Sequence, residues 1–321
     1  MSRRKEIIAA NEVSQMYTFP LGGFPQKVLI EGKKKGLPIV IFLHGGPGTP
    51  IPFSAGCRGL FPQFTDRFLM VYWDQPGCGI NHCDLDDDMR ISHFVDMTAD
   101  LVCQVKNLFP QNKLLLFSAS WGSVLSAEVL RKTDLVDGVV ACGQITHHLF
   151  FNSPLTKALE ASSIPASKLD SLRQIEPQMI CPEDLSLISS CIRKYTQGYN
   201  NKKGKIPVGQ MCSIIFGMMT SPDYSMPDFR AVMMNGYTGK LGLWPELLRL
   251  DLTENLKAVQ VPYRMLQGDT DIVATTEFVQ SIVNSSANPH LTCQVIPDTG
   301  HYPSPAAMDA ALNALIELAE S

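Results

Sequence analysis

The stretch 113–123, K-L-L-L-F-S-A-S-W-G-S, constrains the fold of this chain more than any other. Its first half is a short apolar run of the kind that is buried in a parallel sheet, and a helical pattern begins at Trp121. A sharp turn from strand to helix must therefore fall on residues 118–122. This turn follows the pattern G-x-S-x-G, with Ser118 in place of the first glycine and Ser120 at the centre.

The chemistry of this turn depends on its central residue. In a G-x-S-x-G turn that residue is strained and lifts its hydroxyl above the sheet, so the positions two before and two after it must be small. Ser118 and Gly122 are both small. Ser120 is therefore a candidate nucleophile, and the alternative is a serine that only caps the following helix.

Composition indicates a globular chain and excludes several classes of partner. With 321 residues, 45% of them hydrophobic, the chain can form one large α/β domain with an insertion, or two domains. The net charge of -4 offers no basic field for nucleic acid or for an anionic membrane, so we expect neither as a partner. No apolar run approaches the roughly 18 residues that a membrane helix needs.

The nine cysteines indicate the compartment. They form no C-x-x-C pair and no metal-ligand spacing with the seven histidines. An odd, scattered set is typical of free thiols in a reducing environment. The basic residues Arg3, Arg4 and Lys5 are followed by polar residues and not by an apolar signal segment. We therefore expect a cytoplasmic protein, whose oligomeric state the sequence does not indicate.

Apolar runs alternate with helical patterns along most of the chain. Residues 13–43 predict an antiparallel meander, whose last run, P-I-V-I-F-L at 38–43, is fully apolar and should lie at the centre of the sheet. This alternation predicts a mostly parallel, doubly wound α/β sheet. Further strands are predicted at 67–73, 113–117, 136–142, 261–267 and 291–296, with helices at 91–109, 121–131, 276–283 and 304–318.

The pattern changes between about residue 146 and residue 250. This segment has helical stretches broken by eight prolines, no convincing buried strand, and seven of the fourteen methionines. We predict a helical cap domain at 146–250, inserted into a core domain that comprises 1–145 and 251–321. Methionine side chains are flexible, so such a cap could adapt to apolar ligands.

Two glycine-rich loops carry a resemblance to a known family. The motif H-G-G-P-G at 44–48 resembles a signature of the proline iminopeptidases, which are members of the α/β-hydrolase fold. The loop D-Q-P-G-C-G at 74–79 is similar to the family's D-Q-R-G-x-G, with Pro76 in place of the arginine. The resemblance implies an α/β-hydrolase fold, with a mostly parallel doubly wound sheet and an inserted helical cap.

The resemblance also implies a catalytic triad. A serine hydroxyl is a poor nucleophile until a base removes its proton, and that base needs a carboxylate to orient it. The fold supplies these groups in the chain order Ser, Asp, His, which Ser120, Asp271 and His301 follow. Asp269 competes with Asp271 for the acid, and the family's G-x-x-D spacing, counted from Gly268, selects Asp271. His301 follows a glycine, as in the family's G-H turn.

The oxyanion hole should consist of backbone N–H groups. One donor is expected at Trp121, directly after the nucleophile, and the other at Gly46, or at Gly45 if the loop shifts. His44 should brace its own glycine turn and not titrate in catalysis. No cofactor and no metal are implied, because the triad itself performs the chemistry.

The cap segment departs from the family. Proline iminopeptidases hold the substrate's free amino terminus with acidic cap residues, one of them in a segment like A-R-x-E-N-H-Y. The similar run here, A-V-M-M-N-G-Y at 231–237, has Met234 in place of the glutamate. We expect Met234 and Tyr237, together with Gly45, to contact the substrate. An ammonium group buried against a thioether would lack its counter-charge, at a cost of several kcal/mol.

The sequence therefore predicts a cofactor-independent Ser-His-Asp hydrolase that cleaves a small, fairly apolar ester or amide. One alternative is a true prolyl aminopeptidase that acts on short peptides and uses another cap acid, such as Glu160, Glu176 or Glu183. Another, from a different class, is a receptor that keeps the fold and binds a ligand without catalysis.

Overall fold

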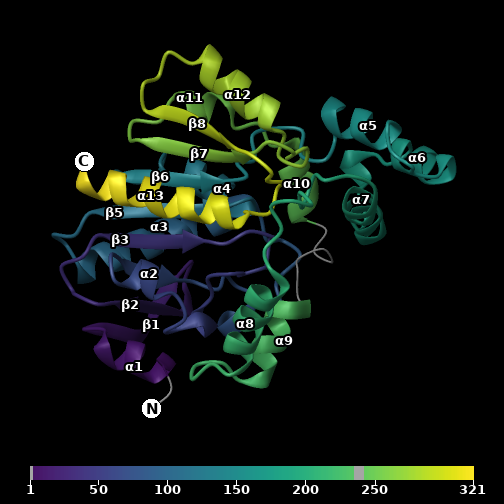
Figure 1. The fold of residues 1–321 in the computed structure, drawn as a ribbon. Helices are drawn as coiled ribbons and strands as arrows, with labels where there is room; N and C mark the ends of the chain where they lie inside the picture. The colour runs from purple at the N-terminus through teal and green to yellow at the C-terminus, as the bar shows by residue number, and fades with distance from the viewer. Residues whose placement is uncertain (1–2, 235–241) are drawn as a thin grey trace.

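The centre of the molecule is one mixed sheet. A computed structural model describes residues 3–234 and 242–321. Its strands are β1 Val13–Leu21, β2 Phe24–Gly32, β3 Ile39–Leu43, β4 Leu69–Tyr72, β5 Leu114–Ala119, β6 Gly138–Cys142, β7 Tyr263–Gly268 and β8 Leu291–Ile296. In this part of the chain they form an eight-stranded sheet in the order β1-β2-β4-β3-β5-β6-β7-β8 (Figure 1).

The sheet is antiparallel only at one end. β1 pairs antiparallel with β2, and β2 pairs antiparallel with β4. The prediction that 38–43 completes an antiparallel meander is wrong, because β3 lies between β4 and β5 and pairs with both in parallel. Every side chain of β3 is buried, which requires a strand covered on both faces. The predicted central position of this run is therefore confirmed, although its partners differ.

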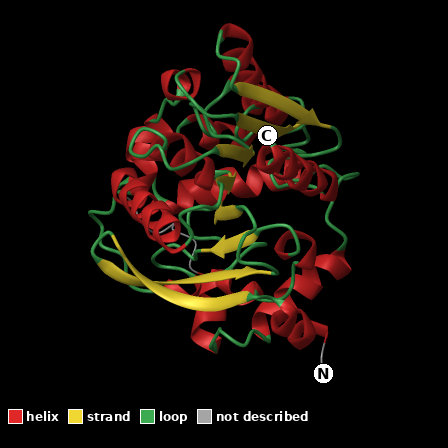
Figure 2. Cartoon of the chain, turned by 90° about the vertical axis from the view of Figure 1, so that its left-hand side faces the viewer, coloured by secondary structure: helices red, strands yellow, loops and turns green. Residues whose placement is uncertain are grey.

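Helices cover both faces of the sheet, as a doubly wound fold requires (Figure 2). Alternate residues of β3 face opposite cores: Ile39 and Ile41 pack on one side, and Val40 and Phe42 on the other. The helices outside the insert are α1 Arg3–Ala10, α2 Pro62–Thr65, α3 Ile91–Leu108, α4 Trp121–Val129, α11 Thr253–Lys257, α12 Thr276–Ser285 and α13 Pro305–Glu320. α3, α4 and α12 pack in the first core, and α2 and α13 in the second.

The segment between β6 and α11 is helical and lies outside the sheet. Its helices are α5 Ser153–Glu160, α6 Ala166–Arg173, α7 Pro182–Tyr195, α8 Val208–Met219, α9 Met226–Met234 and α10 Leu243–Arg249. α5 to α7 form a group on one side and α8 with α9 a group on another, while α10 contacts α3 of the core (Figure 1). The helical character agrees with the predicted cap, and the domain boundaries at 145/146 and 250/251 stay a prediction.

The α8–α9 group is fastened to the core by charged side chains. Arg58 forms two hydrogen bonds to the Asp223 carboxylate, at 2.7 and 2.8 Å, and both side chains are largely buried. The Tyr224 hydroxyl donates to the Asp74 carboxylate, which lies at the end of β4. Arg4 on α1, a helix that the sequence did not predict, donates to the carbonyl oxygen of Gly217 at 2.6 Å. Contacts of this kind hold α8 and α9 against the core.

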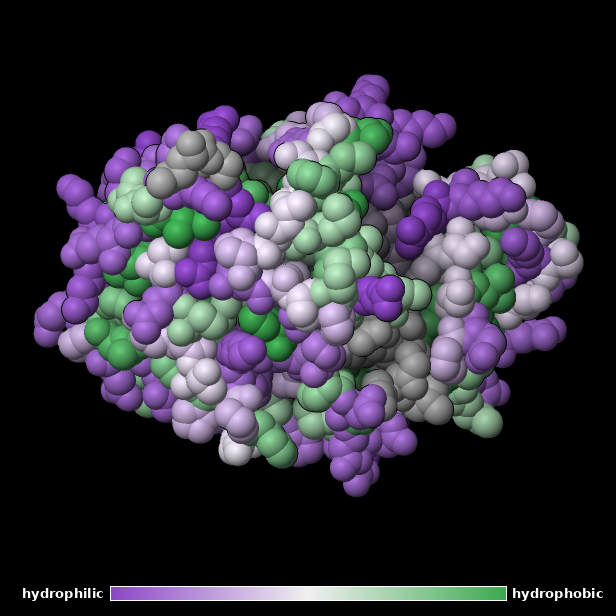
Figure 3. Space-filling model, turned by 90° about the horizontal axis from the view of Figure 1, so that it is seen from below, coloured by the Kyte–Doolittle hydropathy of each residue, from purple (hydrophilic) through white to green (hydrophobic). Residues whose placement is uncertain are grey.

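The outer face of α8 and α9 exposes large apolar side chains. Figure 3, which views the molecule from this side, shows apolar residues gathered among polar ones. The exposed apolar residues on these two helices are Val208, Phe216, Met219, Met226, Met233 and Met234. Within residues 3–234 and 242–321, no helix combines the length and the apolar character that crossing a bilayer demands.

Candidate active site

The turn between β5 and α4 has the geometry that its sequence predicts. Ser120 has φ 49° and ψ −117°, a conformation that L-residues rarely adopt. Gly122 passes so close to β3 that a Cβ atom there would lie 1.9 Å from the carbonyl oxygen of Leu43. A side chain at position 122 would therefore collide with backbone, which explains why this position must be glycine. Ser118, at the other small position, is fully buried.

The structure brings Ser120, His301 and Asp271 together. The Nε2 atom of His301 lies 2.8 Å from the Ser120 hydroxyl, and its Nδ1 atom lies 2.9 Å from Oδ2 of Asp271. An ionised carboxylate only accepts hydrogen bonds, so Nδ1 carries the proton in the neutral ring. Nε2 is then free to accept the hydroxyl proton of Ser120. The geometry suits a nucleophile, a base and an orienting acid, and the assignment of these roles stays a prediction.

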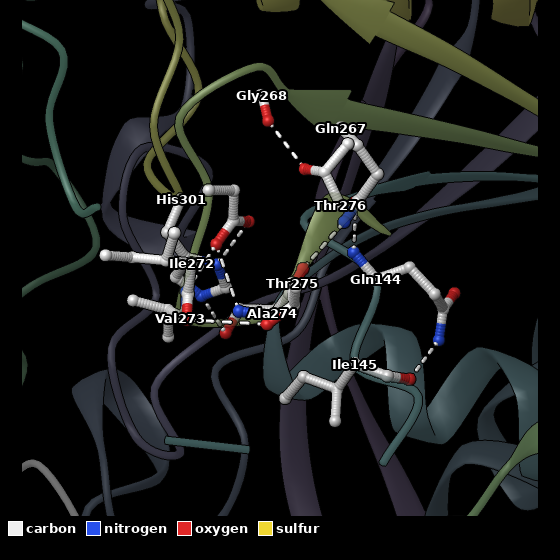
Figure 4. Close-up of polar contacts among 12 residues, drawn as sticks. Gln144, Ile145, Gln267, Gly268, Ile272, Val273, Ala274, Thr275, Thr276 and His301 are labelled. Atoms are coloured by element: carbon white, nitrogen blue, oxygen red, sulfur yellow. Dashed lines mark hydrogen bonds and ion pairs between the residues drawn. The ribbon is translucent and has the colours of Figure 1, made fainter. Parts of the chain in front are cut away.

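The loop after β7 fixes the Asp271 carboxylate. Its Oδ1 atom accepts hydrogen bonds from the N–H groups of Val273 and Ala274 at 2.9 and 3.0 Å, which leaves Oδ2 for His301. Gln267 in turn donates from Nε2 to the carbonyl oxygen of Ala274 at 2.9 Å (Figure 4). The carboxylate is fully buried and its two oxygens have separate partners.

Asp269 has a different position. Its two carboxylate oxygens accept from the N–H groups of Thr299 and Asp298, at 2.9 and 3.0 Å. These residues belong to the loop that leads to His301, and Asp269 itself is exposed. Asp269 therefore braces the histidine loop, while Asp271 contacts the histidine ring.

The same loop is also held by the insert. The N–H of His301 donates to the carbonyl oxygen of Gly198 at 2.7 Å, and the N–H of Tyr302 donates to that of Tyr199 at 2.9 Å. The Tyr199 ring stacks on the Tyr302 ring, with centroids 5.1 Å apart, and contacts the His301 ring edge-on at 6.2 Å. The segment that follows α7 thus supports His301 through both backbone and side chains.

The H-G-G-P-G loop lies directly against Ser120. A Cβ atom on Gly45 would lie 3.3 Å from Cβ of Ser120. Gly46 has φ 117°, a conformation that favours glycine. Nε2 of His44 accepts from the backbone N–H of Gln75 at 3.0 Å, so Nδ1 carries the ring proton and donates to the carbonyl oxygen of Gly45 at 2.9 Å.

Burial makes His44 a structural residue. Complete burial lowers the pKa of His44 to about 4, so the ring stays neutral at ordinary pH. Its two ring nitrogens are both engaged by backbone groups. His44 therefore braces the glycine turn as the sequence analysis expected, and it has no ring nitrogen left for proton transfer.

The D-Q-P-G-C-G loop joins the other two motifs. The side-chain oxygen of Gln75 accepts from Nε1 of Trp121 at 2.8 Å, which links this loop to the first residue of α4. Asp74 accepts from the N–H groups of Ala55 and Ile80, each at 2.9 Å, and from Tyr224. Burial raises the pKa of Asp74 to about 6 despite these donors. The three motifs therefore form one hydrogen-bonded framework beneath Ser120.

The expected oxyanion donors flank Ser120. Trp121 is the first residue of α4, so its backbone N–H has no acceptor in a preceding helical turn. Gly46 lines the same cavity as Ser120, and Gly45 lies next to it. The positions suit a pair of donors on either side of a substrate carbonyl, and the assignment of the oxyanion hole stays a prediction.

Ser120 and His301 open into a cavity of about 660 Å³ between the core and the insert. Much of its wall is apolar, and Phe150 stacks on Trp244 with ring centroids 6.4 Å apart. The apolar lining includes Ile51, Ile145, Leu149, Phe150, Leu185, Trp244 and Val273. A cavity of this size accommodates a small molecule, as binding sites of such dimensions usually do.

The residues predicted to contact the substrate do not all line the cavity that contains Ser120 and His301. Met234 ends α9 with 78% of its surface exposed and is not among the residues that line this cavity. Tyr237 lies outside the described residues. The three acids considered for an amino terminus, Glu160, Glu176 and Glu183, are exposed and do not line the cavity either. Gly45 does line it.

Several residues that line the cavity were not predicted from the sequence. Arg193, Lys194 and Tyr199 line the cavity beside Ser120 and His301. Arg193 and Lys194 belong to α7, whose ordinary amphipathic pattern does not tell a core-facing stripe from one that faces a cavity, and Tyr199 lies in the segment that follows this helix. Gln267, which supports the Asp271 loop, was predicted only as the last residue of a strand.

Comparison with known proteins places the chain in a family. Residues 38–305 match the family model described as alpha/beta hydrolase fold. A probable aminopeptidase of Bacillus subtilis, YbaC, is 23% identical over 299 residues, which are 91% of this chain and 92% of that protein. The proline iminopeptidase of Neisseria gonorrhoeae is 40% identical over 116 residues, 35% of this chain and 34% of its own.

A solved structure has the same fold. The proline iminopeptidase of Mycobacterium smegmatis aligns with a TM-score of 0.61 at 19% identity, covering 95% of this chain and 98% of its own. The predicted α/β-hydrolase fold, with its mostly parallel sheet, is confirmed. The chain therefore belongs to the alpha/beta hydrolase family, and it is a hydrolase similar to the proline iminopeptidases.

Proposed function

We propose that this protein is a cofactor-independent serine hydrolase that cleaves a small acyl ester or amide. The observation that carries the proposal is the chain of two hydrogen bonds from Ser120 through His301 to Asp271, at 2.8 and 2.9 Å, at the wall of a cavity. The nine free cysteines fit a reducing compartment such as the cytoplasm, where we expect it to work.

The proposed reaction has two steps. Oγ of Ser120 attacks the acyl carbon while its proton passes to Nε2 of His301, and the N–H groups of Trp121 and Gly46 stabilise the oxyanion. The imidazolium then gives this proton to the leaving alcohol or amine, which leaves an acyl-serine. Water attacks the acyl-serine with His301 again as the base, and the carboxylic acid product and free Ser120 result. The Asp271 carboxylate accepts the hydrogen bond from Nδ1 of His301 and stabilises the imidazolium in both steps.

A fluorophosphonate probe tests the nucleophile. The probe should label the purified protein at Ser120, and Ser120→Ala should abolish the labelling because no activated hydroxyl remains. Ser118→Ala provides the matched control, because Ser118 lies two residues away but is fully buried. Labelling that survives in Ser120→Ala, or that is lost in Ser118→Ala with the fold intact, would refute the assignment.

The second candidate function is that of a prolyl aminopeptidase. The names of two relatives, a probable aminopeptidase and a proline iminopeptidase, favour it. Against it, none of the described residues that line the cavity is an aspartate or a glutamate, so a substrate ammonium group would lose hydration without gaining an ion pair.

Three substrates of similar size separate the two candidates. They are a prolyl arylamide, the same arylamide acetylated at nitrogen, and a short-chain acyl ester. We expect kcat/KM to be highest for the ester, and the free amine to have no advantage over its acetylated form. A strong preference for the free amine would identify the protein as an aminopeptidase.

A further inference from the structure

The charged residues that line the cavity are all cationic. Among the described lining residues, Arg193 and Lys194 carry full charges, His301 is the proposed base, and no carboxylate is present. Neither Arg193 nor Lys194 forms a salt bridge with another described residue. Both side chains are exposed, so their charged groups are accessible to a ligand. A cavity with this balance repels cations and attracts anions.

Arg193 stands close to the proposed base. Its guanidinium carbon lies 5.8 Å from the centroid of the Tyr199 ring, and this ring contacts His301 and Tyr302. One aromatic ring therefore separates the guanidinium from the imidazole. Lys194 lies over the Tyr195 ring, with Nζ 5.3 Å from its centroid. Stacking on tyrosine faces orients both cations without neutralising them.

Hydroxyl groups precede these cations on the same helix. The cavity-facing residues of α7 change along its length from apolar Pro182 and Leu185, through hydroxyls, to the two cations. The hydroxyls belong to Ser186, Ser189 and Ser190. The Ser189 hydroxyl lies 3.2 Å from the Tyr199 hydroxyl, so these two groups are hydrogen-bonded to each other. Hydroxyl donors beside a guanidinium can complete the coordination of an anionic oxygen group.

We propose that the last turns of α7 recognise an anionic oxygen group, a carboxylate or a phosphate, on the substrate. This inference rests on the proposed function of the same cavity. The helix C-terminus carries a partial negative charge of about half a unit, which opposes an anion, but two full positive charges outweigh it. The substrate class is then a short acyl compound whose apolar part fits the apolar wall and whose anionic part meets Arg193. This specificity is opposite in sign to that for a free amino terminus.

A pair of chromogenic esters tests the inference. The 4-nitrophenyl monoester of glutaric acid and 4-nitrophenyl valerate have similar acyl chains, but only the first ends in a carboxylate. We expect Arg193→Gln to lower kcat/KM for the glutarate ester about tenfold to a hundredfold, the usual loss for a hydrogen bond to a charged group. The valerate ester should change less than twofold, and added salt should reduce the difference between the two esters.

Arg173→Gln is the matched control for charge. Arg173 is an exposed arginine of the insert that pairs with Glu160 at 2.7 Å and does not line the cavity. The control variant should leave kcat/KM unchanged for both esters. Lys194→Gln should act in the same direction as Arg193→Gln and with a smaller effect, because an ammonium lacks the bidentate fork of a guanidinium.

A binding measurement separates this inference from the proposed function. Ser120→Ala, which cannot form an acyl-enzyme, is titrated calorimetrically with butyrate, propylphosphonate and the neutral analogue butyramide. We expect one or both anions to bind more tightly than butyramide, and Arg193→Gln in the same background to remove the difference. The two anions distinguish a carboxylate site from a phosphate site.

Each outcome decides one of the two claims. If the valerate and glutarate esters have equal kcat/KM and Arg193→Gln affects neither selectively, the anion site is refuted and the hydrolase stands. If neither ester is cleaved and the fluorophosphonate does not react, the proposed function fails, and the calorimetric comparison still tests the anion site. Tighter binding of butyramide than of both anions would overturn the inference on its own.

Discussion

Asp271→Asn is the most informative single substitution in the proposed triad, because asparagine keeps the shape of aspartate and loses one acceptor. In the structure, Oδ1 of Asp271 accepts from two backbone N–H groups and Oδ2 accepts from His301. An amide has one oxygen and one NH₂ group, so it cannot accept on both sides. The substitution must therefore break the hydrogen bonds on one of the two sides.

The two possible orientations of the amide have different costs. If its oxygen stays with Val273 and Ala274, its NH₂ faces Nδ1 of His301, and the ring must move its proton to Nε2. That tautomer cannot accept the proton of Ser120. If the amide turns over, the NH₂ faces two N–H donors, and this leaves buried donors without acceptors at about 1–3 kcal/mol each. The first orientation preserves the fold and should dominate.

The expected loss follows from the tautomer. In Ser-His-Asp triads, this wrong tautomer lowers kcat about 10⁴-fold. Such a factor corresponds to about 5 kcal/mol of activation free energy. The free energy of unfolding should change much less, because the loop keeps its two backbone hydrogen bonds.

The assay compares two aspartates that lie two residues apart. kcat/KM for a chromogenic ester is measured for the unmodified protein, Asp271→Asn and Asp269→Asn. Asp269 accepts only from the loop before His301, so Asp269→Asn should cost about tenfold or less, the equivalent of about one hydrogen bond. Retention of more than a tenth of the activity in Asp271→Asn, or the reverse ranking of the two variants, would refute the proposed role of Asp271.

Three further predictions concern residues outside the triad. Gly122→Ala should yield little folded protein, because its Cβ would lie 1.9 Å from the Leu43 carbonyl oxygen. Gly209→Ala should be tolerated, because a Cβ there would have no neighbouring atom within 4 Å, and equal yields of the two variants would contradict this prediction. Burial raises the pKa of Glu31 from 4.5 to about 7, so ionising it in the folded state destabilises the protein as pH rises through this range. In urea titrations, the free energy of unfolding of Glu31→Gln, relative to that of the unmodified protein, should rise by about 3 kcal/mol between pH 4.5 and pH 8. A difference that does not change with pH would contradict this prediction. Met234→Glu should change kcat/KM for a prolyl arylamide by less than about twofold, since the Met234 side chain is exposed and does not line the cavity. A tenfold gain would mean that the side chain at position 234 reaches the substrate.

The sequence was most informative where one residue type alone fits the backbone. The turn at Ser120 and the loop at Gly46 require small residues or glycine for steric reasons, and these requirements are visible as motifs. The strands near the centre of the sheet were predicted because both of their faces are buried, which produces continuous apolar runs.

Prediction was weaker where partners come from distant segments. The pairing of β3 with β4 and β5 depends on the whole sheet, and a local apolar run cannot distinguish it from a third meander strand. The helix α1 has no buried residues, and Arg4 is positioned by carbonyl groups far along the chain. Arg193 and Tyr199 likewise reach the cavity only through the placement of α7 and of the segment that follows it, which no motif there indicates.

The backbone hydrogen bonds from His301 and Tyr302 to Gly198 and Tyr199 have a consequence for protein engineering. Exchanging α5 to α7 for the corresponding helices of a relative would be an obvious way to transfer substrate preference. A graft that extended past the end of α7 at Tyr195 would also replace the segment whose two carbonyl groups hold the loop that carries His301. A chimera should therefore retain residues 196–201 of this chain and place its junctions before and after them. The insert is, in this respect, a part of the scaffold that cannot be treated as an interchangeable module.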